Sequence, residues 1–522
     1  MSKWQNDFVL PSGWAKATIS EVIQPFQNSD PAKSERDSFH YIDINAIDNT
    51  LHRVTEPKFL PTDKAPSRAR KMVRSGDVLI SLVRPYLKNI AIVPQELDNQ
   101  WASTAFCICR PHEGIDSRFL YYLYLHNDFL NTIPTYGDSP PSGHDDDLLA
   151  TSIAIPPEKE LSRIVDRIEE LFTDLDAGIA ALERVKRNLS RYRAAVLHAA
   201  VTGRLTEEWR KEHGPPEEPA SELLERILEE RRKQWEEKTL AGYEAKEKKP
   251  PKNWKVRYKE PVPPKPLEEG KPLPPLPQGW SWASLDQLAD VTGGITKNTK
   301  QAGQPGMRDV AYLRVANVQR GYLDLTEIKF ISAKEKDINE LRLRQGDVLF
   351  TEGGDRDKLG RGWVWEEQIE ECVHQNHVFR ARPFLSEVNS ELISHSGNSY
   401  GQVWFRTGGI QSVNLASISL GVIKYFPVPL APSEEQDEIA FSVNEKLTQI
   451  DALESEVSRG LSRANRLRQA ILKAAFEGKL VPQDPNDEPA SVLLERIREQ
   501  ASKTPKTKRK TRKKSSRKAA TT

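Results

Sequence analysis

The strongest constraint in this sequence is that three of its motifs occur twice, in the same order. The second copies follow the first by 266, 270 and 275 residues. The pairs are Gly-Trp at 13–14 and 279–280, Arg-x-Gly-Asp-Val-Leu at 74–79 and 344–349, and Ala-Ala-x-x-Gly-x-Leu at 199–205 and 474–480. With 522 residues the chain is also too long for a single core. The repeat therefore predicts two similar domains related by pseudo-two-fold symmetry.

Each copy divides into a globular part and a helical part. The globular parts contain short apolar runs, such as 77–83, that are broken by Pro and Gly, which predicts strands and turns with a few helices. Between the two copies, residues 250–277 are rich in proline and should form an extended spacer. The predicted segments are globular domains at 1–155 and 276–430, long helices at 156–210 and 431–480, a charged helix with a Pro-rich linker at 211–275, and a short helix with a basic tail at 481–522.

The helical parts carry a heptad pattern. Apolar residues recur at alternating steps of four and three from Ile164 to Ala199, and the pattern returns from Ile439 to Ala474. This spacing predicts a coiled-coil seam of about five heptads. An antiparallel pair within one chain would satisfy both seams, and a dimerisation zipper between chains is the alternative. The expected fold class is α+β, with two similar mixed α/β domains separated by two long antiparallel coiled-coil helices.

Charge is unevenly distributed along the chain. Residues 503–522 contain ten Lys or Arg and no acidic residue, whereas the rest of the chain sums to −9. Any nucleic-acid contact in the folded part must therefore be a local patch rather than a general field. The composition of the tail predicts disorder, and the tail either grips phosphates without reading sequence or only aids solubility.

Other bulk features exclude several classes of protein. No apolar run approaches the roughly 18 residues of a membrane-spanning helix, and the first residues lack the apolar core of a signal peptide. Three cysteines are too few for a disulfide framework. We therefore expect a cytoplasmic protein without membrane contact.

Motifs of catalysis are missing from the sequence. It has no Gly-x4-Gly-Lys-Ser/Thr phosphate loop, no Gly-x-Gly-x-x-Gly, and no Asn/Asp-Pro-Pro-aromatic motif of amino-methyltransferases. Cys372, His374 and His377 could hold zinc, but the aligned segment 100–105 of the first copy contains no ligand. We therefore expect neither a catalytic residue nor a metal.

Two loops are candidates for reading DNA bases, which requires Arg, Lys, Asn or Gln side chains that reach a groove. Segments 81–89 and 351–362 follow the two Gly-Asp-Val-Leu strands, and they differ strongly although their flanks agree. One scaffold with two different loops could read two short sequences at the two ends of a duplex site. A solvated surface loop is the alternative for any single residue. Lys88 and Arg361 are the predicted phosphate contacts. The candidate DNA-binding residues are Arg84, Lys88, Asn89, Ser103, Thr104, Asp355, Arg356, Lys358, Arg361, Gln375, Asn376, His377, Arg406, Gln411 and Asn414.

Together these features resemble the specificity subunits of type I restriction-modification systems. The resemblance extends from about Pro11 to Leu480 and rests on the repeated motifs and on the proline-rich entries into the long helices. After the second entry the chain has the Glu-Gln pair that is usual in this family, at 435–436, whereas the first copy has Lys-Glu-Leu at 159–161.

The resemblance implies a role in host defence. It implies two target recognition domains that each read one half of a split site in double-stranded DNA, and helices that set the length of the unread spacer. Two modification (methyltransferase) subunits and further restriction (translocase/nuclease) subunits are the implied partners. In this family S-adenosylmethionine, ATP and Mg belong to those partners, so no cofactor is expected in this chain. Two other functions stay open, namely the recognition part of a fused methyltransferase-nuclease and a coiled-coil scaffold that never binds DNA.

Overall fold

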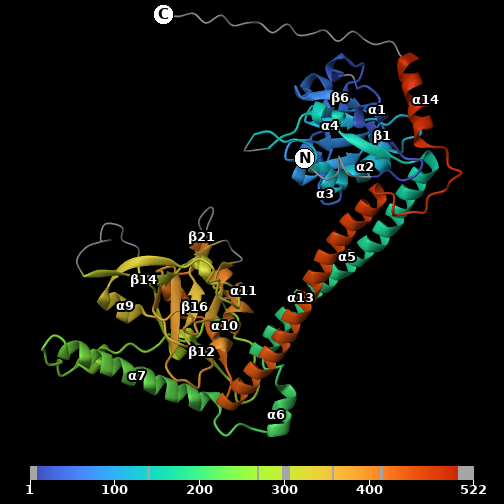
Figure 1. Cartoon of the computed structure of the whole chain (residues 1–522). Helices are drawn as coiled ribbons and strands as arrows, with labels where there is room; N and C mark the ends of the chain where they lie inside the picture. The colour runs from blue at the N-terminus through green and yellow to red at the C-terminus, as the bar shows by residue number, and fades with distance from the viewer. Residues whose placement is uncertain are drawn as a thin grey trace, which may run out of the picture. The chain divides into compact units, whose positions relative to one another are not determined.

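The computed structural model describes residues 9–26, 28–137, 141–266, 270–296, 306–354, 358–408, 410–411 and 416–503. The chain forms two compact units (Figure 1). Unit 1 comprises Met1–Glu183 and Ser458–Thr522, and unit 2 comprises Arg184–Val457. Both long helices pass from one unit into the other, and each unit therefore contains a globular domain and a part of each helix. Among the described residues, no helix combines the length and apolarity needed to cross a membrane.

Unit 1 begins with a domain of short strands. Its strands are β1 (Ala15–Thr18), β2 (Ser38–Ile42), β3 (Ile47–Asp48), β4 (Arg53–Val54), β5 (Lys58–Pro61), β6 (Ala69–Val73), β7 (Val78–Ser81), β8 (Ile90–Ile92), β9 (Gln100–Ser103), β10 (Phe106–Cys109) and β11 (Ser152–Ile155). Its helices are α1 (Ile19–Val22), α2 (Ser117–Leu125), α3 (Asn127–Leu130), α4 (Asp145–Ala150), parts of α5 (Glu158–Val201) and α13 (Ser433–Phe476), and α14 (Ala490–Lys503). Short 3₁₀ turns lie at Pro31–Lys33, Ile44–Ala46, Thr62–Lys64, Pro85–Leu87 and Gln95–Leu97.

Unit 2 repeats this architecture after two connecting helices. Its strands are β12 (Ser281–Ser284), β13 (Ala289–Thr292), β14 (Met307–Leu313), β15 (Lys329–Lys334), β16 (Val348–Thr351), β17 (Gly353–Gly354), β18 (Gly362–Val364), β19 (Cys372–His374), β20 (Val378–Pro383), β21 (Ile410–Gln411), β22 (Ala416–Ser417) and β23 (Pro427–Leu430). Its helices, besides the remaining parts of α5 and α13, are α6 (Glu207–His213), α7 (Ala220–Glu244), α8 (Leu285–Leu288), α9 (Glu335–Leu341), α10 (Ser390–Asn398), α11 (Gly401–Gly408) and α12 (Leu420–Ile423). Turns of 3₁₀ helix lie at Trp254–Arg257 and Val315–Asn317.

The two globular domains have the same core topology. In the first, β1 pairs with β11, β2 lies between antiparallel β5 and parallel β9, and β7 lies between β10 and β8. In the second, β12 pairs with β23, β14 lies between antiparallel β15 and parallel β19, and β16 lies between β20 and β18. The prediction of two similar mixed domains is confirmed. The second domain adds β13 beside β20 and a small sheet of β17, β22 and β21.

The structure explains why the Gly-Asp-Val-Leu motif occurs in both copies. The carboxylate of Asp347 is fully buried, accepts two hydrogen bonds of 2.7 and 2.8 Å from Arg382, and also accepts one from the backbone N–H of Arg344. Asp77 makes the same contacts in the first domain, with Arg110 and the N–H of Arg74. Two neighbouring strands are thereby joined at one end by a charge-assisted, bidentate pair.

The Gly-Trp motif and the glycine after each long helix meet within each unit. In unit 1 a Cβ on Gly478 would lie 3.2 Å from the ring of Trp14, and in unit 2 a Cβ on Gly203 would lie 3.2 Å from the ring of Trp280. Both glycines also have positive φ angles, 67° and 68°, that other residues rarely adopt. Each globular domain is thus closed by the end of the long helix that follows the other domain in sequence.

The tryptophans also anchor the starts of the helices. The indole N–H of Trp14 donates to Glu160 at 3.0 Å, and that of Trp280 donates to Glu435 at 2.7 Å. Glu160 therefore does in the first copy what Glu435 does in the second, although the residues beside them differ. Burial raises the pKa of Glu160, whereas Glu435 also forms an ion pair with Arg210.

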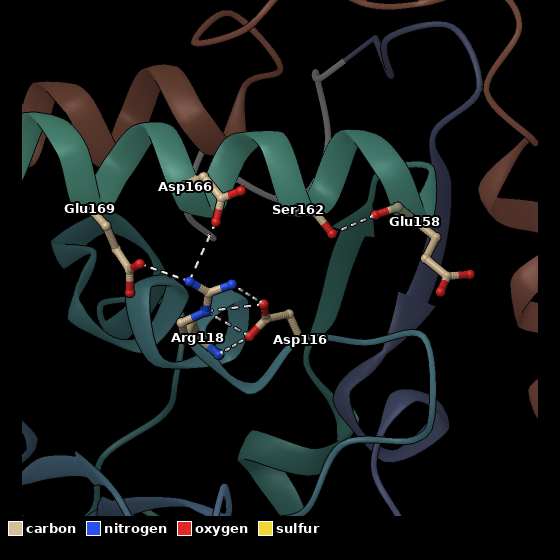
Figure 2. Close-up of polar contacts among 6 residues, drawn as sticks. All are labelled: Asp116, Arg118, Glu158, Ser162, Asp166 and Glu169. Atoms are coloured by element: carbon tan, nitrogen blue, oxygen red, sulfur yellow. Dashed lines mark hydrogen bonds and ion pairs between the residues drawn. The ribbon is translucent and has the colours of Figure 1, made fainter.

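A cluster of charges fastens the first domain to the start of α5 (Figure 2). The guanidinium of Arg118, in the first turn of α2, lies 2.7 Å from Asp116 and 2.7 Å from Glu169 and within 3.4 Å of Asp166. These bonds raise the pKa of Arg118, the hydrogen bond to Asp116 having the largest effect. The side chains of α2 on the other side, Phe119 and Leu120 among them, lie in the core of the domain.

The long helices pair antiparallel in each unit. Both contain 44 residues, and they begin directly after Pro157 and Pro432. In unit 1 Arg468 forms an ion pair with Asp176, and in unit 2 Arg193 forms ion pairs with Asp451 and Glu454, so residue numbers fall along α13 as they rise along α5.

Only half of the predicted seam is covered. One heptad series is buried or partly buried throughout, and its members are 168, 175, 182, 189 and 196 on α5 and 443, 450, 457, 464 and 471 on α13. The other series is covered near the helix ends but open in the middle. The side chains of Val185, Tyr192, Leu453 and Leu467, the exposed seam residues, are between 43% and 52% exposed. Two helices alone bury only a narrow strip, and the globular domains shield the second series only where the helices begin and end.

Candidate nucleic-acid interface

In both domains the predicted reading residues gather at one end of a sheet. The antiparallel pairing of β7 with β10 places Ser81 opposite Phe106, and that of β16 with β20 places Thr351 opposite Val378. The loop after β7 or β16 and the turn before β10 or β20 consequently emerge side by side. We call this the loop end of each domain.

In the first domain Arg84 and Thr104 are exposed at the loop end. Arg84 has a left-handed backbone, with φ 52°, and its N–H donates to the carbonyl of Pro141 at 2.9 Å. The N–H of Thr104 donates to the carbonyl of Arg68 at 2.9 Å. Both side chains therefore project from a backbone that is fixed by hydrogen bonds.

Three other predicted residues of this domain point inward. The ammonium of Lys88 donates to the carbonyl of Leu125 at the end of α2, 2.8 Å away, and burial lowers its pKa. Asn89 and Ser103 are buried, and the Ser103 hydroxyl accepts a hydrogen bond from the N–H of Ala105. In this conformation these three side chains support the loops rather than face a ligand.

The loop end of the second domain is built around the turn 375–377. Gln375 and Asn376 are half-buried and His377 is exposed. The imidazole of His377 lies 2.5 Å from the carboxylate of Glu352, and the N–H of Glu352 donates to the carbonyl of His377. The preceding His374 is buried, and burial lowers its pKa to about 4. The turn thus presents the side-chain amide of Asn376 and the imidazole of His377, next to the buried His374.

The longer loop of the second domain is described in part. Lys358 is half-buried, and Arg361 donates to the side-chain oxygen of Gln319 at 2.7 Å. Arg406 is exposed on α11 and donates to the carbonyl of Gln402. The backbone of Gln411 belongs to β21. Asp355, Arg356 and Asn414 lie outside the described residues, as does most of the basic tail.

Three further residues belong to these loop ends. Tyr86 is exposed in the turn after Arg84, and Tyr322 is exposed beside Gln319 in the turn between β14 and β15. The N–H of Gln319 donates to the carbonyl of Tyr322, and its side chain accepts the bond from Arg361. The polar turn Gln-Arg-Gly-Tyr at 319–322 could have indicated Gln319 and Tyr322. Tyr86 could not be identified in this way, because a single tyrosine after Pro85 could equally be a core residue.

The chemistry available at the loop ends is that of hydrogen bonding and charge. Arginine, amide, imidazole and hydroxyl groups are the types that read base edges and grip phosphates. Within the described part of the chain no group of three or more His, Cys, Asp or Glu side chains is placed to hold a metal ion. Cys372 and His374 are buried in the domain core, and His377 faces Glu352 instead of them.

Known proteins of similar sequence are specificity subunits of type I restriction enzymes. No protein-family model matches the chain. The chain is 25% identical to the type I restriction enzyme EcoKI specificity subunit of Escherichia coli K12, over 94% of this chain and 96% of that protein. It is 23% identical to the StySPI specificity subunit of Salmonella potsdam, with the same coverage.

A solved structure resembles the fold over nearly its full length. It comes from work on complex assembly and conformational transition of the type I R-M system. The TM-score is 0.63 at 25% identity, and the match covers 91% of this chain and all of that one. Over nearly its whole length the chain is thus similar to the specificity subunits of type I restriction enzymes.

Proposed function

We propose that this chain reads a two-part site in double-stranded DNA, with one globular domain on each half-site. The observation that carries the proposal is that two domains of one topology present different loops at equivalent ends. The first offers Arg84 and Thr104, and the second offers Asn376, His377 and Lys358. A shared scaffold with divergent loops suits the reading of two different base sequences.

The long helices are proposed to set the unread spacer between the half-sites. A helix of 44 residues is about 66 Å long. Half-site centres one turn apart are separated by about 34 Å. The paired helices are therefore long enough to fix the distance between two domains that bind the same side of a duplex.

The proposed partners of the helices are two modification subunits, with restriction subunits joining the complex. S-adenosylmethionine, ATP and Mg would serve those partners. The exposed seam residues support this assignment, because large apolar side chains at heptad spacing on a helix pair suit further helices. Tyr192 and Leu467 lie 275 residues apart and so occupy equivalent positions in the two copies, as two copies of one partner require.

Charging the exposed seam residues should prevent assembly. We expect Tyr192→Glu with Leu467→Glu to abolish co-purification with the modification subunit, because each carboxylate would be buried without a partner. The free chain should keep its melting temperature, since both sites are half exposed in it. Ser190→Glu with Ser455→Glu, which changes exposed polar positions on the same helices by the same charge, should assemble normally.

Two assays on the purified full chain test the proposed function. Titration of duplex DNA should show binding that weakens steeply with salt, because phosphate contacts release counterions. DNA methylation should require the modification subunit. If the chain does not bind DNA, or binds it with an affinity that does not depend on salt, a protein scaffold is favoured. Methylation by the chain alone would favour a fused enzyme.

A further inference from the structure

An exposed Lys-Phe pair occupies the same position in both globular domains. Lys58-Phe59 lies on β5, and Lys329-Phe330 lies on β15, 271 residues later. Phe59 is 65% exposed and Phe330 is 68% exposed. A single exposed phenylalanine is ordinary on a protein surface. The same exposed residue at the same strand position in two diverged copies calls for a common cause.

The strands that carry the pair are equivalent edge strands. Among the described strands, β5 pairs with β2 alone, where Phe59 faces His40, and β15 pairs with β14 alone, where Phe330 faces Ala311. On the opposite side of these strands, Leu60 and Ile331 pack into apolar clusters. Each phenylalanine is therefore held outward by a strand whose other face is anchored.

The pair lies close to the loop end of each domain. In the second domain Ala311, opposite Phe330, also pairs with Cys372, three residues before Gln375. In the first domain Lys58 lies opposite Tyr41, which pairs with Trp101, three residues before Thr104. Three strand residues span about 10 Å, and the two strands crossed add about 10 Å. A bound duplex that touches the loops can thus reach the pair.

Each lysine forms an exposed ion pair with a carboxylate of its own domain. The ammonium of Lys58 lies 2.6 Å from Asp43, and that of Lys329 lies 3.3 Å from Glu327, with both lysine side chains more than half exposed. Ion pairs this exposed contribute little to stability, so a phosphate can replace the carboxylate at small cost.

We propose that the sugar–phosphate backbone of duplex DNA runs along the open edges of β5 and β15. There the lysine, on one face of the strand, binds a phosphate, and the phenylalanine, on the other face, packs against deoxyribose. This rests on the proposed function. The loops differ between the domains and would read bases, which differ between half-sites. A contact that both domains share must instead meet what both half-sites share, and that is the backbone.

The pairs should therefore supply affinity without sequence preference. Phe59→Ala or Phe330→Ala should weaken binding about tenfold, and both together about a hundredfold, on cognate and unrelated duplexes alike. Lys58→Ala or Lys329→Ala should lower the slope of log affinity against log salt by about one. Leu51→Ala with Val256→Ala, which removes exposed apolar side chains elsewhere in each unit, should leave affinity unchanged.

The test is a fluorescence-anisotropy titration of a cognate and an unrelated duplex at several salt concentrations. The full chain would be used, alone and in complex with its modification subunit, with the melting temperature as the folding check. Equal loss on both duplexes in the double phenylalanine variant, at an unchanged melting temperature, supports the proposal. Unchanged affinity overturns it, as does loss restricted to the cognate duplex.

Two further outcomes would show that the pairs do not bind DNA. If the phenylalanine variants bind DNA normally but lose the modification subunit, the pairs form a protein contact and the proposal is wrong. If the chain without substitutions and its complex with the modification subunit bind no DNA, the proposed function is wrong, and this inference is wrong with it.

Discussion

Exchange of residues 80–150 for the equivalent segment of another specificity subunit should replace the base sequence of one half-site and leave the other unchanged. The segment contains the loop after β7, the turn before β10 and the helices that support them. Each mismatched base pair costs about 1–3 kcal/mol, so a half-site of three base pairs discriminates by about 3–9 kcal/mol. Recognition of the original half-site should therefore be lost completely.

Sequencing of modified bases in a host that expresses the exchanged chain measures this result. The matched experiment exchanges residues 350–415 and should alter only the other half-site. A change of both half-sites after either exchange would show that the domains do not read independently. The residues of the long helices and of the repeated Gly-Trp contacts lie outside both exchanged segments. Arg118 should be kept in the first exchange, because it joins the domain to α5.

Removal of the buried carboxylate of Asp347 should destabilise unit 2 by about 3–5 kcal/mol. Asp347→Ala removes the acceptor of the backbone N–H of Arg344. It also removes the anion that pairs with the Arg382 guanidinium, which keeps its hydrogen bond to the carbonyl of Arg342. For a unit of this size the loss corresponds to a fall in melting temperature on the order of 10 °C. Asp77→Ala should do the same to unit 1, because Asp77 makes the same contacts.

Calorimetry of the variants provides the measurement and its control. Glu208→Ala removes an exposed ion pair with Lys211 and should leave the melting temperature almost unchanged. The double variant Asp347→Ala with Arg382→Leu should recover part of the loss, since no charge is then left without a partner. A double variant that loses at least as much as the single one would contradict this explanation.

Local features of the fold could be predicted from the sequence, and contacts between distant segments could not. The heptad pattern and the flanking prolines predicted α5 and α13, because helix periodicity and helix ends depend on nearby residues. The repeat predicted a shared topology. The ion pairs of Asp77 with Arg110 and of Asp347 with Arg382 depend on the pairing of β7 with β10 and of β16 with β20, which no single segment reveals.

The strands that carry the candidate loops could be predicted from the sequence, but the directions of the side chains could not. The predicted Gly-Asp-Val-Leu strands are β7 and β16. Lys88 turns inward and donates to the carbonyl of Leu125, a contact between distant segments that nothing in the sequence marks. The heptad pattern predicted the seam residues, but it does not indicate which of its two series a second helix covers. The sequence did not indicate that Phe59 and Phe330 are exposed, because it does not distinguish an exposed phenylalanine from a buried one.

The measurement that most directly tests the central claim is the spacer length after one heptad is inserted into each long helix. Seven residues after Glu183 and seven after Gly460 preserve the seam and lengthen the pair by about 10.5 Å. At 3.4 Å per base pair, the modified sites should contain a spacer longer by about three base pairs. Both half-sites should stay the same. An unchanged spacer in the sequenced modified sites would contradict the proposal that these helices set the distance between two reading domains.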